Sequence, residues 1–250
     1  MKKIGFYLAL LTGLFFLSCE KHNEELGDTP DKISIGAVNN MFIKQYYTTL
    51  DGSYFSPEDL NIDLDSDGND DIKLTSEIWG SPTVGHIPKS SIQCLSDNVQ
   101  IAGFFKIDTS FLHKEIDTTV GPNNIVINDS LFYTCHQIDP SDSIIKIKYD
   151  VFKISPKDKN DVLTRSDDFK SDNITLLFDT SFYDSYFEIS PDTVMFVYNI
   201  FLNDCYTFPR DEIKYIGIKI TKNEIEKLGW IKLGLFDTSR ILIVESAIQH

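Results

Sequence analysis

The sequence predicts an all-β fold, an antiparallel β-sandwich of the jelly-roll or immunoglobulin-like (Ig-like) kind. Apolar and polar residues alternate over many short segments from Leu60 onward, as expected for strands with one buried face. Clusters of Asp, Ser, Asn, Pro and Gly separate these segments and suit turns. The chain has 250 residues, of which 42% are hydrophobic, so it can bury a substantial core.

Each expected strand is a short segment whose apolar residues share one face. Leu60, Ile62 and Leu64, for example, are spaced by two and therefore point to the same side of an extended chain. Longer versions of this pattern recur as far as the C-terminus. The segments that we expect to form strands are 60–64, 72–78, 99–107, 124–127, 144–154, 174–178, 194–201, 215–220, 230–236 and 241–247.

Two segments depart from the pattern of strands. Residues 223–228 end at Gly229, a residue type that commonly terminates helices, and they are the best candidate for a helix of one or two turns. Residues 155–173 are the most polar interior segment and form either a linker between two β-units or a long surface loop. The strand-like composition on both sides favours the loop, and with it a single domain.

The N-terminus has the organisation of a secretory signal. Met1–Lys3 is a short positive head, and residues 4–17 are almost all apolar but too few to span a bilayer as a helix. The segment ends in Phe16-Leu17-Ser18-Cys19, which resembles a bacterial lipobox, where the cysteine is diacylated and becomes the mature N-terminus. An ordinary cleaved signal, with Cys19 as an incidental thiol, is the alternative. The resulting divisions are a signal peptide at 1–18, a flexible acidic tether at 19–32 and a β-sandwich domain at 33–250.

The charge of the chain excludes one class of partner and constrains membrane attachment. The net charge is −15 and becomes −17 when residues 1–18 are removed, because two lysines and no acidic residue are lost. Arginine, the residue best suited to phosphates and base edges, occurs only at Arg165, Arg210 and Arg240, so nucleic acid is not an expected partner. Anionic headgroups would repel the chain, so the membrane is expected to hold it through acyl chains on Cys19. We therefore expect an outer-membrane lipoprotein that faces the periplasm or the cell surface.

Three cysteines follow the signal: Cys94, Cys135 and Cys205. An odd number leaves at least one thiol unpaired in a monomer, so at most one disulfide forms, and the sequence does not choose the pair. No two of these cysteines lie within a few residues of each other, so they carry no metal-binding motif. The favoured interpretation is that they are small buried side chains.

An aspartate-rich segment is the one motif that carries chemistry. Counting from Asp63, aspartate occupies positions one, three, five and nine, and Gly68 supplies a sharp turn at position six. Ca²⁺ takes six to eight oxygen ligands, and alternate carboxylates on a tightly curled loop converge on one point. Position twelve is Leu74, not the bidentate glutamate of a helix-loop-helix calcium hand, and the flanks alternate as strands. The expected calcium ligands are the side chains of Asp63, Asp65, Asp67 and Asp71 and the backbone carbonyl of Asn69.

This segment resembles the Asp-x-Asp-x-Asp-Gly-x-x-Asp β-hairpin calcium loop of FG-GAP and integrin-type repeats, although a single copy does not imply a propeller. Ca²⁺ is the expected cofactor, and with the ligands assigned above Asp70 is expected to point away from the ion or to reach it through water. The alternative is an acidic turn without a cation, which five aspartates within nine residues make electrostatically costly. A bound metal either clips the hairpin or serves a further function, and the clip is the favoured interpretation.

A second resemblance lies near the C-terminus. Tyr215-Ile216-Gly217, Gly229-Trp230-Ile231 and Ala247-Ile248 are similar to the closing "YIG…GWI…AI" strands of uncharacterised Bacteroidetes surface or periplasmic lipoproteins, which also carry an early Asp-rich calcium turn. The resemblance covers residues 60–78 and 212–248, and it implies a secreted β-sandwich without a known activity. The tryptophan of this trio is expected in the core, not as a platform that stacks on a ligand.

The sequence carries no familiar catalytic motif: no nucleophile elbow, no His-Glu-x-x-His and no phosphate-binding glycine loop. The favoured function is therefore a lipid-anchored binding or structural module of the cell envelope, stabilised by one calcium ion, with an unidentified glycan or protein as its ligand. The alternative is a secreted hydrolase of glycans or peptides. It would require paired carboxylates, or a hydroxyl or thiol bonded to His86, His113 or His136.

Overall fold

The computed structural model describes residues 30–53, 56–81, 85–178, 180–202, 205–236 and 239–250. Within these ranges the chain folds into strands and turns, without an α-helix. The strands form a ten-stranded, a four-stranded and a two-stranded sheet. Nearly all neighbouring strands are antiparallel, so the prediction of an all-β, antiparallel sandwich is confirmed.

The ten-stranded sheet runs in the order β12-β13-β7-β6-β14-β15-β16-β2, and β8 and β10 also pair with β6. Its longest strand is β6, with 22 residues. The strands of this sheet are β2 (Met41–Asp51), β6 (Val99–Val120), β7 (Ile125–Thr134), β8 (Ser143–Ile154), β10 (Asp168–Lys170), β12 (Thr180–Ser190), β13 (Thr193–Phe201), β14 (Ile213–Lys222), β15 (Ile225–Phe236) and β16 (Arg240–Gln249).

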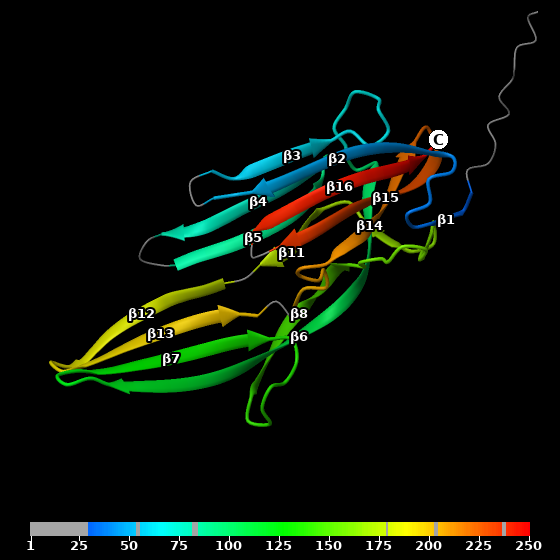
Figure 1. The fold of residues 1–250 in the computed structure, drawn as a ribbon. Helices are drawn as coiled ribbons and strands as arrows, with labels where there is room; N and C mark the ends of the chain where they lie inside the picture. The colour runs from blue at the N-terminus through cyan, green and yellow to red at the C-terminus, as the bar shows by residue number, and fades with distance from the viewer. Residues whose placement is uncertain (1–29, 54–55, 82–84, 179, 203–204, 237–238) are drawn as a thin grey trace, which may run out of the picture.

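The smaller sheets cover the two faces of one half of the large sheet. The four-stranded sheet has the order β11-β5-β4-β3, and the two-stranded sheet pairs β1 with β9. Figure 1 shows β3, β4, β5 and β11 lying beside β2, β16, β15 and β14 to form the two layers of the sandwich. The strands of the smaller sheets are β1 (Lys32–Ser34), β3 (Glu58–Ile62), β4 (Ile72–Ser81), β5 (Gly85–Cys94), β9 (Val162–Thr164) and β11 (Asn173–Phe178).

The core follows from alternation along the strands. Ile216 and Ile218 of β14 point toward the four-stranded sheet and pack in one buried cluster with Leu74 and Ile92 of that sheet. Tyr215 of the same strand points to the opposite face of the large sheet. It packs there in a second buried cluster, beneath β1 and β9. Trp230 of β15 belongs to the second cluster and is 1% exposed, so the expectation of a core tryptophan is met.

The other half of the large sheet extends beyond the sandwich. We call this half the arm, and it comprises β7, β12, β13 and the C-terminal half of β6, residues 110–120. In Figure 1 the described strands of the arm form a single layer that projects away from the sandwich. Many of its described residues are accordingly only partly buried, and Ile116 is 63% exposed. The arm also contains a parallel pair, β7 with β13, which the antiparallel expectation did not include.

The predicted helix at 223–228 is wrong. Lys222 pairs with Ile225 across the β14–β15 hairpin, and the two residues between them form its turn. Asn223 and Glu224 have φ values of 51° and 66°, which is the left-handed backbone that tight two-residue hairpin turns require. The segment therefore enters β15 directly, and the strand continues through Gly229 instead of ending there.

The structure pairs two of the three cysteines that the sequence left open. Cys135 and Cys205 form a disulfide between residues separated by 70 positions in the sequence. Cys94 is a free, half-buried thiol at the end of β5. The disulfide ties the end of β7 to the segment that leads from β13 to β14, where the arm meets the sandwich.

The polar segment 155–173 contains two short strands of the fold. β9 pairs with β1, and β10 pairs with the N-terminal half of β6. An additional strand, β2, precedes the first strand expected from the sequence and forms the edge of the large sheet. β2 was missed because the more buried positions between Lys44 and Leu50 include the polar residues Lys44 and Thr48, so burial alternates there without an apolar alternation in the sequence.

Candidate metal centre

The candidate metal centre is the acidic loop, residues 63–71, which joins β3 to β4. Ile62 and Ile72 pair across these antiparallel strands and close the loop at its base. The φ values of Ser66 and Gly68 are 63° and 90°, so the backbone turns sharply at both positions. The loop is therefore a β-hairpin connection, as expected, and not part of a helix-loop-helix site.

The carboxylate of Asp63 organises the backbone of the acidic loop. Its Oδ1 accepts a hydrogen bond from the backbone N–H of Ser66 at 2.7 Å, and its Oδ2 accepts one from Gly68 at 3.1 Å. Further along, the backbone N–H of Asn69 donates to Asp67 Oδ1 at 2.8 Å. These local hydrogen bonds curl the loop and explain why aspartate at alternate positions favours this conformation.

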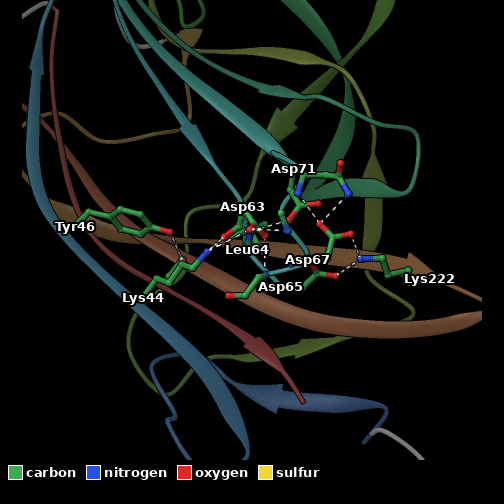
Figure 2. A network of polar contacts seen from close by, with 12 residues as sticks. Lys44, Tyr46, Asp63, Leu64, Asp65, Asp67, Asp71 and Lys222 are labelled. Atoms are coloured by element: carbon green, nitrogen blue, oxygen red, sulfur yellow. Dashed lines mark hydrogen bonds and ion pairs between the residues drawn. The ribbon is translucent and has the colours of Figure 1, made fainter.

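Three of the predicted ligands converge. One carboxylate oxygen from each of Asp63, Asp65 and Asp71 lies within 4.8 Å of the others. Asp71 is the most enclosed of them, at 8% exposed, and its Oδ2 accepts a hydrogen bond of 2.7 Å from the backbone N–H of Leu64. Burial, followed by the negative charges of Asp65 and Asp63, raises the pKa of Asp71. Figure 2 shows these side chains together within the loop.

A lysine from the large sheet contacts one side of the acidic loop. Lys222, the last residue of β14, places its Nζ 2.7 Å from Asp65 Oδ2 and in close contact with Asp67 Oδ2 (Figure 2). The hydrogen bond from Lys222, with a smaller contribution from Asn69, lowers the pKa of Asp67 to about 2. The two carboxylates in turn raise the pKa of Lys222.

A second lysine approaches from β2. Lys44 donates from Nζ to the backbone carbonyl of Asp63, and the same Nζ lies 3.7 Å from Asp63 Oδ2. Nearby, the hydroxyl of Tyr46 lies 3.1 Å from Ser246 Oγ on β16. Burial raises the pKa of Tyr46, and the charges of Asp63 and Asp71 add to this effect. The acidic loop of the small sheet is thus held against two strands of the large sheet.

The donor set of the acidic loop fits a hard cation. Carboxylate oxygens are the ligands that Ca²⁺ prefers, and three of them already lie close enough to bind one ion. The loop carries five aspartates, whereas only Lys44 and Lys222 contribute ammonium groups in the contacts just described. Three negative charges therefore remain uncompensated by these lysines.

Not every predicted ligand lies in the cluster. Asp67 faces Lys222, and the side-chain amide of Asn69 donates to Asp67 Oδ1 at 3.2 Å. Asp70 is directed elsewhere, as expected, because its Oδ2 accepts a hydrogen bond of 2.9 Å from the side chain of Asn61. Both lysines were missed by the sequence analysis, since strand pairing far from the loop, and no local motif, brings them to it.

One of the three histidines considered for the alternative hydrolase function, His113, contacts carboxylates. His113 Nδ1 lies 2.8 Å from Asp142 Oδ1, and Nε2 lies 3.2 Å from Glu115 Oε1. The hydrogen bond to Asp142 is the main reason that the pKa of His113 is raised. Asp142 also accepts backbone hydrogen bonds from Ile138 and Asp139, so this group fixes a turn between β7 and β8. Both ring nitrogens of His113 therefore face carboxylates and not a nucleophile.

The remaining site expectation lies outside the described residues. Cys19, the predicted acylation site, belongs to the first 29 residues, which the structure does not describe. The side chain of His86 is likewise not described. In the described part of the chain, no helix is long and apolar enough to cross a bilayer.

Comparison with protein-family models, with curated proteins and with solved structures gives no match to this chain. The resemblances to FG-GAP calcium loops and to Bacteroidetes lipoproteins therefore stay predictions.

Proposed function

We propose that this chain is a lipid-anchored protein of the cell envelope whose β-sandwich is stabilised by one calcium ion bound in the acidic loop. The convergence of Asp63, Asp65 and Asp71 is the observation that carries the calcium site. Asp67 and the backbone carbonyl of Asn69 are the remaining ligands in this proposal. The lipobox-like segment that ends at Cys19 carries the anchor.

The position of the acidic loop supports a structural role for the ion. The loop belongs to the four-stranded sheet, whereas Lys44 and Lys222, which contact it, belong to the large sheet. Neutralising the loop would reduce the repulsion between carboxylates at the contact between the two layers. A bound calcium ion would therefore stabilise the sandwich, and it would supply charge neutralisation and cross-linking, not catalysis.

Saturating calcium is expected to raise the free energy of unfolding by about 2–4 kcal/mol, because the ion binds the folded loop and not the unfolded chain. In a thermal melt of the full chain this corresponds to about 5–10 °C. Asp65→Asn is expected to abolish the response. Asp70→Asn is the matched control, since Asp70 lies in the same loop outside the carboxylate cluster.

A further variant separates calcium binding from general loop damage. Lys222→Met removes the ammonium group that contacts Asp65 and Asp67, so the affinity of the loop for calcium is expected to increase. If the loop did not bind calcium, the substitution would remove an ion pair and no calcium binding would be measured. Isothermal titration with calcium, with magnesium as a comparison, measures this difference. A melting temperature that is the same in calcium and in EGTA would refute the calcium proposal.

Acylation of Cys19 is expected to hold the protein in the membrane fraction of a bacterial host. Cells fed an alkyne-tagged palmitate should incorporate the tag into the full chain, and Cys19→Ala should lose both the tag and the membrane association. Cys94→Ala is the control, because Cys94 is a free thiol that lies inside the fold, far in sequence from the proposed acylation site. Unchanged membrane association of Cys19→Ala would count against the anchor.

A further inference from the structure

A cavity of about 450 Å³ lies where the arm meets the sandwich. It is lined by β6 and β8 of the large sheet, by β10 and β11, and by the segment that carries Cys205. Asp172 and Asn173 at its rim are exposed, so the cavity opens to solvent on that side. Its volume lies within the range of roughly 300–1,000 Å³ that is common for small-molecule sites.

The charged side chains that line the cavity neutralise one another. Lys153 Nζ lies 2.7 Å from Asp108 Oδ2, and both side chains are 8% exposed. At the rim, Lys170 Nζ lies 2.7 Å from Asp172 Oδ2. Two lysines and two aspartates therefore leave the lining without net charge. A charged ligand would find no uncompensated partner here, so the lining favours a neutral one.

The floor of the cavity holds an incompletely satisfied acceptor. Asp108 is a buried residue that lines the cavity. Its Oδ2 is paired with Lys153, whereas Oδ1 has no hydrogen-bond partner among the described residues, and Lys106 Nζ lies 3.9 Å from it, beyond hydrogen-bond distance. A buried carboxylate oxygen without a donor costs free energy. A hydroxyl group of a ligand, or a water molecule that the ligand holds, would supply the missing donor.

The rest of the lining is amphipathic. The lining residues include the aromatic Phe152, Tyr133 and Tyr206 and the hydroxyl-bearing Ser110 and Thr175. A ring with apolar C–H faces and hydroxyl groups at its edge matches both kinds of surface.

We propose that this cavity binds a neutral, hydroxyl-rich ring compound of the size of a monosaccharide or a disaccharide unit. The inference goes beyond the proposed function, and neither the calcium ion nor the acyl chain enters the argument. The ligand is therefore expected to bind at the arm–sandwich junction both in calcium and in EGTA, provided that the protein remains folded.

Isothermal titration of the full chain with neutral hexoses, pentoses, N-acetylhexosamines and their disaccharides tests the proposal. At least one is expected to bind with a dissociation constant of about 1 mM or tighter. Thr175→Trp places a bulky side chain in the cavity and should weaken binding at least about tenfold. Thr118→Trp, at an exposed position on the arm, is the matched control and should bind as the unmodified chain does.

A conservative variant tests the charge argument without filling the cavity. Asp172→Asn leaves Lys170 without its carboxylate partner, so the ratio of glucuronate binding to glucose binding should rise about threefold. Circular dichroism verifies that each variant is folded. The proposal is overturned if no neutral sugar binds in this range, if folded Thr175→Trp binds as tightly as the Thr118→Trp control, or if glucuronate or glucosamine binds the unmodified chain more tightly than glucose.

Discussion

Loss of the Cys135–Cys205 disulfide is expected to lower the free energy of unfolding by about 4 kcal/mol. The bond joins residues that are 70 positions apart, so it removes a large loop-closure entropy from the unfolded chain. The measurement is urea denaturation of the double variant Cys135→Ala/Cys205→Ala beside the oxidised parent.

Two controls accompany the disulfide experiment. Cys94→Ala removes a half-buried free thiol and should change the free energy of unfolding by less than about 1 kcal/mol. Reduction of the parent with dithiothreitol should reproduce most of the loss seen in the double variant. A double variant as stable as the oxidised parent would mean that the bond does not constrain the unfolded chain as argued.

Replacement of Lys153 alone by methionine is expected to lower the free energy of unfolding by about 3–5 kcal/mol. The substitution leaves the carboxylate of Asp108 buried without its ammonium partner, and it also removes the hydrogen bond from Lys153 to the carbonyl of Cys205. The double variant Lys153→Met/Asp108→Leu removes both charges, and we expect it to recover most of the loss.

The same aspartate offers a matched control for the buried ion pair. Lys106 Nζ lies 3.9 Å from Asp108 Oδ1, but its side chain is 54% exposed, so Lys106→Met should cost less than about 1 kcal/mol. Chemical denaturation of the single and double variants forms a double-mutant cycle. Additive losses for the Lys153 and Asp108 variants would show that the two charges do not act as a pair.

The sequence was sufficient to predict those elements whose conformation is set by neighbouring residues in the chain. Alternation of apolar residues identified β4, β14 and most other strands, because burial of one face imposes a period of two. The acidic loop was found because its geometry is set by its own side chains, as the hydrogen bonds of Asp63 show. The helix expected at 223–228 failed because a short stretch fits a helical turn and a hairpin entry equally well.

What could not be predicted depends on contacts between distant segments. Lys44 and Lys222 approach the acidic loop because two sheets pack together, and no sequence motif near the loop indicates these contacts. The pairing of Cys135 with Cys205 likewise required the positions of β7 and β14. The arrangement of the arm was also not predicted, because the parallel pairing of β7 with β13 cannot be recognised from the hydrophobic pattern of either strand.

The pairing of β2 with β16 has a consequence for the order of folding. Met41 lies opposite Gln249, so one of the first described strands completes its hydrogen bonds only with the last strand of the chain. A nascent chain that lacks β16 would leave the edges of β2 and β15 open. Contacts of such long sequence separation also slow folding. The sandwich is therefore expected to close late, only after β16 has been synthesised, because both β2 and β15 pair with that strand.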